Sequence, residues 1–147
     1  MASDLQSKQP RVLEGLQMQI VNLMTSEPVT IAARETLSKA KSLMEGGGFR
    51  RLPVLDDGRL VGILTERDLH QYAGYLESTR VNAAMSTALV TVTPNNTVED
   101  AARLMLKHKI GGLPIVAGGT PVGIVTTSDL LRAFLIVVAG TSQIVNP

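Results

Sequence analysis

The sequence contains no cysteine and no tryptophan, and it has only two phenylalanines and two tyrosines. Without cysteine the chain cannot form disulfides, thiolate nucleophiles or cysteine-ligated metal sites. So few aromatic rings cannot form the stacking platforms on which single-stranded nucleic acid binds. Apolar residues nevertheless make up 44% of the chain. The hydrophobic core must therefore be built from valine, isoleucine, leucine, methionine and alanine.

A large charge of either sign is also lacking, since 14 basic and 13 acidic side chains leave a net charge of +1. This balance argues against a nucleic-acid or membrane-surface partner. Residues Met1 to Arg11 are polar and show no secretory signal. The most apolar stretch, Leu130 to Ala139, is interrupted by Arg132 and is far shorter than the roughly 20 residues of a membrane-spanning helix. We expect a cytoplasmic protein in which this stretch forms a helix buried in the core or at a subunit contact.

An internal duplication accounts for most of the 147 residues. Residues 82–131 align with residues 21–70 at a constant offset of 61, without a gap. The identities are spread over the whole unit and include the pairs Met24/Met85, Val29/Val90, Thr36/Thr97, Ala40/Ala101, Leu52/Leu113, Gly58/Gly119, Thr65/Thr126 and Asp68/Asp129. The chain therefore consists of two similar units, and the similarity is not limited to one shared motif.

Each unit shows the same order of secondary-structure signals. A short β-rich piece is followed by a helix with a threonine cap, then by two β-rich runs around a tight turn, and finally by a second helix. In the first unit these elements start near Val29, Thr36, Leu52, Leu60 and Thr65, and its turn contains an Asp-Gly pair, which is a strong hairpin signal. Each unit is thus predicted as β-α-β-β-α. The predicted fold class is α/β (α+β), with an approximate two-fold axis between the repeats.

The duplication divides the chain into an N-terminal arm (1–20), a first repeat (21–76), a second repeat (77–137) and a C-terminal tail (138–147). In the arm, apolar residues recur at helical spacing and predict a short helix packed on the main body: Val12, Leu13, Leu16 and Ile20. A single unit of about 50 residues buries little of its surface alone. We therefore expect the repeats to share one hydrophobic core, with equivalent clefts between them.

A Thr-x-x-Asp spacing directly follows a buried-strand pattern at Thr65–Asp68 and again at Thr126–Asp129. One interpretation is a capping box, in which the threonine caps a helix and the aspartate bonds back to the N–H of the cap residue. The same spacing at Thr97–Asp100, at another predicted helix start, supports this interpretation. The alternative is a binding role, since one carboxylate can accept hydrogen bonds from both hydroxyls of a vicinal diol. Their matched positions after buried strands favour this role for Asp68 and Asp129.

Several ordered motifs together resemble the CBS domain, and the pair of repeats resembles a Bateman module over about residues 20–135. These motifs are Met24-Thr25 and Met85-Ser86, Leu52-Pro53-Val54 and Leu113-Pro114-Ile115, and the two Gly-h-h-Thr-x-x-Asp stretches. The resemblance implies a regulatory module that binds AMP, ADP, ATP or S-adenosylmethionine between its repeats. It implies ribose contacts at Asp68 and Asp129 and at the neighbouring hydroxyls of Thr65 and Thr126. Contacts to the base are implied near Thr30, Ile31, Thr91 and Val92, and beside Pro53 and Pro114.

A ligand with phosphate groups would need positive charge near the cleft. Arg50-Arg51 precede the first Leu-Pro, whereas Gly111-Gly112 occupy the matching places in the second unit. We predict a phosphate contact for Arg50 or Arg51, and a weaker candidate is the Lys107-His108-Lys109 run. The alternative for all five residues is a solvated surface, which charge clusters usually form. This asymmetry predicts that the two sites differ in their preference for phosphate.

The sequence contains no visible catalytic apparatus and no metal site. Its two histidines, His70 and His108, are far apart, and no nucleophile lies beside a plausible base. Our first hypothesis is a regulatory module without catalytic activity or cofactor, which senses an adenine nucleotide or adenosyl ligand. It would act as a homodimer, or through an unknown effector protein, with apolar helix faces buried between subunits (Leu130, Leu131, Phe134 and Val138). The second hypothesis is a ligand-free module for dimerisation or protein interaction. A divalent-cation sensor and an enzyme are weaker alternatives.

Overall fold

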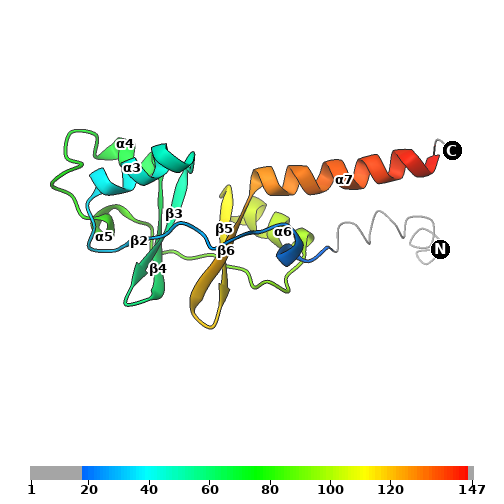
Figure 1. Ribbon diagram of the computed structural model, residues 1–147, viewed down its shortest axis with the longest axis horizontal. Helices are drawn as coiled ribbons and strands as arrows, with labels where there is room; N and C mark the ends of the chain where they lie inside the picture. Colours follow the sequence, from blue (N-terminus) through cyan, green and yellow to red (C-terminus); the bar gives the residue numbers. More distant parts are fainter. Residues whose placement is uncertain (1–17, 146–147) are drawn as a thin grey trace.

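Two three-stranded sheets and their helices make up residues 18–145, the part of the chain that the computed structural model describes (Figure 1). The elements of the first repeat are β2 (Ile31–Ala32), α3 (Leu37–Gly47), β3 (Arg51–Asp56), β4 (Arg59–Thr65) and α4 (Glu66–Gln71). Those of the second are α6 (Val98–His108), β5 (Gly112–Ala117), β6 (Thr120–Thr126) and α7 (Thr127–Val145). Three short elements precede them: η1 (Ile20–Asn22) and β1 (Thr25–Ser26) before β2, and α5 (Val81–Ala84) before α6. The predicted mixed α/β fold of two repeats is confirmed.

Both hairpins, β3–β4 and β5–β6, are antiparallel and turn through two successive residues with positive φ. In the first turn φ is 54° at Asp57 and 78° at Gly58, and in the second it is 62° at Gly118 and 81° at Gly119. Two central residues with positive φ define a type I′ turn, whose twist matches that of the flanking strands. The hairpins that the sequence predicts at these turns are therefore present.

The first strand of each unit is shorter than the sequence predicts. β2 pairs in parallel with β3, and it starts only at Ile31, opposite Val54. In the second repeat no strand forms at residues 90–92, where Val92 makes a single parallel bridge to Ile115.

The predicted threonine caps start both helices that pack on the sheets. The hydroxyl of Thr36 accepts a hydrogen bond from the N–H of Lys39 at 3.2 Å, and that of Thr97 accepts one from Asp100 at 3.1 Å. The buried faces have the predicted spacing: Leu37, Ala40 and Met44 in α3, and Val98, Ala101 and Met105 in α6. These faces anchor each helix on the sheet of its own repeat.

The repeats exchange short segments. β1, which precedes the first repeat's own strands, pairs with β6 of the second repeat, with Thr25 opposite Ile124. At the equivalent place 61 residues later, Ser86 forms an antiparallel bridge to Ile63 of β4. β4 and β6 also contact each other at the centre of the molecule, as Figure 1 shows. The two sheets are therefore joined by strands as well as by the linker.

The hydrophobic interior differs from the single shared core that we expected, because each repeat has a cluster of its own. Leu52, Val54 and Leu64 lie in the first cluster, and Leu113 and Val125 lie in the second. The exchanged segments complete both clusters. Ile20, from before the first repeat, is fully buried in the second cluster, and Val81, its equivalent 61 residues later, is fully buried in the first. Each half thus gains from the other the apolar surface that it lacks alone.

The last helix, α7, continues from the second repeat through residues 138–145, which belong to the predicted C-terminal tail. In Figure 1 it extends well beyond the sheets. None of the helices in residues 18–145 is both long and apolar enough to cross a membrane. Of the predicted N-terminal helix, Val12, Leu13 and Leu16 lie outside the described residues.

Candidate functional site

The two strand-to-helix corners have the hydrogen bonds of a capping box. At the first, the carboxylate of Asp68 accepts from the N–H of Thr65 at 2.8 Å, and the Thr65 hydroxyl accepts from the N–H of Asp68 at 3.3 Å. At the second, the same bonds join Asp129 and Thr126 at 2.8 and 3.4 Å. Thr97 and Asp100 form a third capping box. The capping interpretation is therefore correct for all three, and only position separates a possible binding site from a simple cap.

The first corner opens into a cleft of about 500 Å³ between the repeats, which we name the Asp68 cleft. From the first repeat it is lined by Arg50, Arg51, Ile63, Thr65, Glu66, Arg67 and Asp68. From the second repeat and its preceding segment it is lined by Ser86, Ala88, Leu89, Val90, Lys109, Ile110, Gly111, Gly112 and Pro114. The wall of the cleft thus combines a carboxylate and a hydroxyl with cationic side chains from both repeats.

The second corner opens into a cleft of about 570 Å³, which we name the Thr126 cleft. Its walls are Gly48, Phe49, Arg50, Arg51, Gly111, Ile124, Thr126, Thr127 and Ser128. These residues correspond to the Asp68 cleft at the offset of 61, since Gly48–Arg51 match Lys109–Gly112, and Thr126–Ser128 match Thr65–Arg67. The predicted pair of equivalent clefts between the repeats is therefore present.

Arg50 and Arg51 line both clefts, although the sequence places them in only one repeat. The guanidinium of Arg51 donates to the carbonyl oxygen of Gly111 at 3.0 Å. A Cβ on Gly112 would lie 2.6 Å from Cδ of Arg51, so the glycine provides the space that the arginine occupies. Burial lowers the pKa of Arg51, and the neighbouring charge of Arg50 lowers it further. The arginine therefore carries a positive charge that an incoming anion would stabilise.

The two aspartates occupy different positions relative to their clefts. Asp68 is half-buried and forms part of the cleft wall. Asp129 is only 5% exposed, and it is absent from the wall of the Thr126 cleft. Its second oxygen accepts a hydrogen bond from Arg132, one turn further along α7. The two corners are alike in backbone geometry but differ in how much of the carboxylate a ligand can reach.

The structure does not bring all of the predicted contact residues to the cleft walls. Pro114 lines the Asp68 cleft, whereas Pro53 is fully buried. Ile31 and Val92 bury their side chains in the two cores. The backbone of Val92 is also occupied, since its N–H donates to Pro114 and its carbonyl accepts from Val116. Thr30 is half-buried and Thr91 is exposed. Base contacts at these positions remain predictions.

In the loop between the first helix of each unit and its hairpin, the sequence indicated Lys109 as a candidate cation but did not indicate Ile110, Gly48 or Phe49. Lys109 and Ile110 line the Asp68 cleft, and Gly48 and Phe49 line the Thr126 cleft. Neither loop has a recognisable motif. Only the duplication could have indicated these residues. Because the repeats are equivalent, the loop that contains Arg50 and the matching loop of the second repeat are both expected at a cleft. Of the Lys107–Lys109 cluster, only Lys109 lines a cleft.

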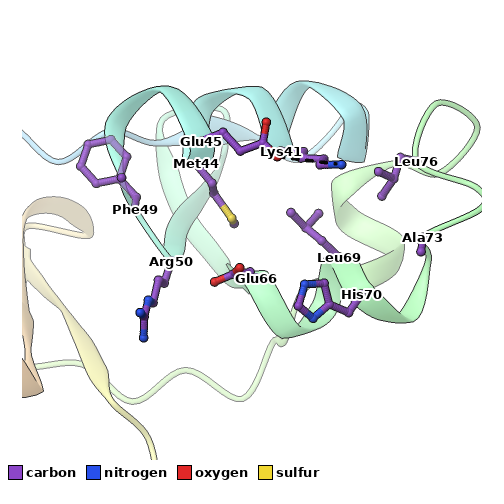
Figure 2. A pocket seen from close by; sticks show the side chains of 11 residues that line it. Lys41, Met44, Glu45, Phe49, Arg50, Glu66, Leu69, His70, Ala73 and Leu76 are labelled. Carbon is purple, nitrogen blue, oxygen red and sulfur yellow. Dashed lines mark ion pairs between the residues drawn. The ribbon is translucent and has the colours of Figure 1, made fainter.

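A third hollow, of about 350 Å³, lies between α3 and α4 (Figure 2). Met44 and Leu69 point into the space between these helices, and Lys41, Glu45 and His70 stand on its rim. Its charged side chains are exposed, and Lys41 and Glu45 pair with each other at 3.9 Å. Residues 18–145 hold no group of three or more metal-ligating side chains, in this hollow or elsewhere. The inter-repeat clefts are therefore the stronger candidates for a ligand site.

Comparison with known proteins agrees with this architecture. The CBS domain profile matches residues 20–74 and again residues 81–136. The CBS domain-containing protein YhcV of Bacillus subtilis is 39% identical over 114 residues, which cover 76% of this chain and 81% of YhcV. A putative acetoin utilization protein (AcuB) from Vibrio cholerae has a solved structure with a TM-score of 0.75 and 32% identity, covering 87% of this chain and 98% of that one. The CBS domain pair of protein MJ0100, solved with 5′-methylthioadenosine and S-adenosyl-L-methionine, has a TM-score of 0.74 and 26% identity, covering 80% and 95%.

Proposed function

Because this chain belongs to the CBS domain family, with one domain on each repeat, we propose that it is a cytoplasmic regulatory module that binds an adenine nucleotide or adenosyl ligand between the repeats. The observation that carries this proposal is the Asp68 cleft. Its wall contains a half-buried carboxylate and two arginines, Arg50 and Arg51, from one repeat and the cation Lys109 from the other.

The chemistry of this cleft suits the two ends of such a ligand. Asp68 uses one oxygen to cap α4 and keeps the other for a ribose hydroxyl, and hydrogen bonds to a charged group contribute about 1.5–3 kcal/mol each. Arg51 and Lys109 are placed to receive phosphate or another anionic group. The solved CBS pair of MJ0100, whose ligands are adenosine derivatives, supports the same ligand class. Binding would change the angle between the repeats, which an effector protein or a partner subunit would detect.

Thermal unfolding with AMP, ADP, ATP and S-adenosylmethionine tests the proposal. A ligand at 100 times its dissociation constant stabilises the folded protein by about 2.7 kcal/mol, which is a shift of several degrees in a domain of this size. The sharper test compares AMP with 2′-deoxy-AMP. Removing one ribose hydroxyl should weaken binding about tenfold or more if Asp68 holds the diol.

Asp68→Asn is the decisive variant, because the amide oxygen can still accept the capping hydrogen bond of Thr65 while the charge is lost. At the Asp68 cleft, this variant should bind AMP and 2′-deoxy-AMP with similar, weak affinity. Asp100→Asn is the matched control, since Asp100 has the same capping geometry and lines neither cleft. If none of the four ligands moves the unfolding temperature, the nucleotide-sensing function is wrong.

We further propose that the protein acts as a homodimer through an exposed apolar face of the second repeat. Leu131 and Phe134 on α7 are 59% and 56% exposed, and Leu106 on α6 is 80% exposed. Leu135 and Val138 continue the stripe at helical spacing. Apolar patches of this kind mark interaction sites in proteins. Leu130, which we also expected in this contact, is half-buried and packs against the second core.

Sedimentation velocity distinguishes this assembly from a monomer. Phe134→Ser should shift a dimer towards monomer, while Tyr75→Ser, an exposed ring on the opposite repeat, should leave it unchanged. The apolar face also supports the alternative function, a ligand-free dimerisation module. That alternative predicts dimerisation together with an unfolding temperature that none of the four ligands moves.

A further inference from the structure

The two corner aspartates differ in the groups that already occupy their carboxylates. Oδ2 of Asp68 accepts from Thr65, and within residues 18–145 no group donates to its Oδ1. Oδ2 of Asp129 accepts from both the N–H and the hydroxyl of Thr126, at 2.8 and 3.1 Å. Oδ1 of Asp129 accepts from the guanidinium of Arg132. One carboxylate thus has an oxygen to offer, and both oxygens of the other are used.

Arg132 is the origin of this difference. Its equivalent in the first repeat, 61 residues earlier, is the neutral and exposed Gln71. Arg132 lies one turn after Asp129 on α7 and pairs with it, with 67% of the arginine side chain exposed but only 7% of the aspartate side chain. The arginine side chain thus remains largely exposed, while the carboxylate that it pairs with is buried.

Recognition of a diol requires carboxylate oxygens that are free to accept hydrogen bonds. At Asp129 a ligand must first displace a charged donor, whereas within residues 18–145 no protein donor has to be displaced from Oδ1 of Asp68. Since the guanidinium is mostly exposed, its ion pair is weak and can open without unfolding α7. Competition of this kind lowers affinity and does not abolish it.

We propose that Arg132 is a specificity-determining residue that lowers the affinity of the Thr126 cleft for diol-bearing ligands, so that the Asp68 cleft fills first. This inference rests on the proposed function, because it assumes that ribose hydroxyls bind the corner aspartates. The Arg132/Gln71 pair thus converts two equivalent clefts into a high-affinity and a low-affinity site.

Isothermal titration calorimetry of the full chain with AMP tests the inference, with each cleft isolated in turn. In an Asp68→Asn background, which leaves the Thr126 cleft, Arg132→Gln should strengthen AMP binding about fivefold, the upper range for an exposed ion pair. In an Asp129→Asn background, which leaves the Asp68 cleft, Gln71→Arg should weaken AMP binding by a similar factor. The gain from Arg132→Gln should disappear with 2′,3′-dideoxy-AMP, which has no diol.

Arg103→Gln is the control for charge, since Arg103 pairs with Glu99 on the surface of α6 and lines neither cleft. It should change neither affinity. If Arg132→Gln bound AMP no more tightly than its background, the inference would be overturned. Binding of AMP by the wild-type protein would still support the proposed function. A wild-type protein and an Arg132→Gln variant that both fail to bind any of the four adenosine ligands would overturn the proposed function and this inference with it.

Discussion

The Asp68 cleft and the Thr126 cleft have the same backbone plan but different rims. Where the first has Glu66 and Arg67 after its threonine, the second has Thr127 and Ser128. Only the first has a lysine on the facing loop, Lys109. The strand-to-helix corner depends on a few capping bonds and on burial, which both copies retain, whereas rim residues are free to differ. Duplication therefore preserves the strand-to-helix corner more strictly than the side chains that surround it.

The outer helices differ in the same way. Glu45 and His70 in the first repeat correspond to Leu106 and Leu131 in the second, at equivalent places on the helix surface. One repeat thus has a charged rim around a small hollow, and the other has an exposed apolar stripe. If the protein dimerises through an apolar face, as proposed above, that face belongs to the second repeat, while both repeats contribute to the clefts.

The largest expected effect concerns the two cores. Leu52 and Leu113 are equivalent, fully buried strand residues, one in each core. Truncation of either to alanine should lower the free energy of unfolding by about 2–5 kcal/mol, because apolar surface is lost and a cavity remains. Since Ile20 and Val81 tie each core to a segment from the other half, we expect both variants to unfold in a single transition.

Urea denaturation, monitored by circular dichroism, measures both the free energy of unfolding and the number of transitions. Leu106→Ala is the control, since this leucine is 80% exposed and its truncation should change the free energy of unfolding little. Two transitions in either variant, one of them at the wild-type midpoint, would show that the repeats unfold independently.

The second-largest expected effect concerns two cations: Arg51, which lines both clefts, and Lys109, which lines only the Asp68 cleft. Arg51→Gln should weaken ADP binding about tenfold or more in both clefts, because a charge-assisted hydrogen bond contributes about 1.5–3 kcal/mol. Lys109→Gln should weaken it only in the Asp68 cleft, and by less, since lysine acts as a point charge without the bidentate geometry of arginine. Adenosine, which has no phosphate, should bind the variants and the wild type alike.

Calorimetry with ADP and adenosine, in the Asp68→Asn and Asp129→Asn backgrounds, measures each cleft separately. Gly112→Ala adds an independent check, because the new methyl group would displace the Arg51 side chain without removing it. It should reproduce part of the ADP loss. Loss of ADP affinity in only one cleft of Arg51→Gln would contradict the shared role of this arginine.

Local patterns in the sequence were sufficient for the repeat architecture, because hairpin turns, threonine caps and helical spacing act over a few residues. The exchange of Ile20 and Val81 between cores could not be predicted, since nothing in an isolated apolar residue specifies which repeat will bury it. The position of Arg51 in both clefts likewise depends on tertiary packing against Gly111 and Gly112. The ion pair between Asp129 and Arg132 has a three-residue spacing that is common on helix surfaces, so the sequence alone did not indicate its place beside a cleft.

The smallest expected effect concerns the third Thr-x-x-Asp motif, Thr97–Asp100, which caps a helix but lines neither cleft. The backbone N–H of Thr97 donates to the carboxylate of Asp100 at 2.9 Å and lowers its pKa, and the amide of Asn96 at 3.1 Å lowers it further. A depressed pKa in the folded state stabilises the protein above the ordinary carboxyl pKa, and this contribution is lost as the pH falls through the acid range.

Asp100→Asn should therefore lower the free energy of unfolding at pH 7 by about 0.5 kcal/mol, the typical contribution of a negative charge at a helix N-terminus. The difference from wild type should be smaller near pH 3 than at pH 7, because the contribution of the carboxylate is lost only as the pH falls through the lowered pKa of Asp100. Denaturation at both pH values measures it, and AMP affinity should remain unchanged because Asp100 lines neither cleft. If Asp100→Asn weakened AMP binding as much as Asp68→Asn, the effect of both variants would be a loss of helix capping, and the assignment of Asp68 as a ligand contact would be wrong.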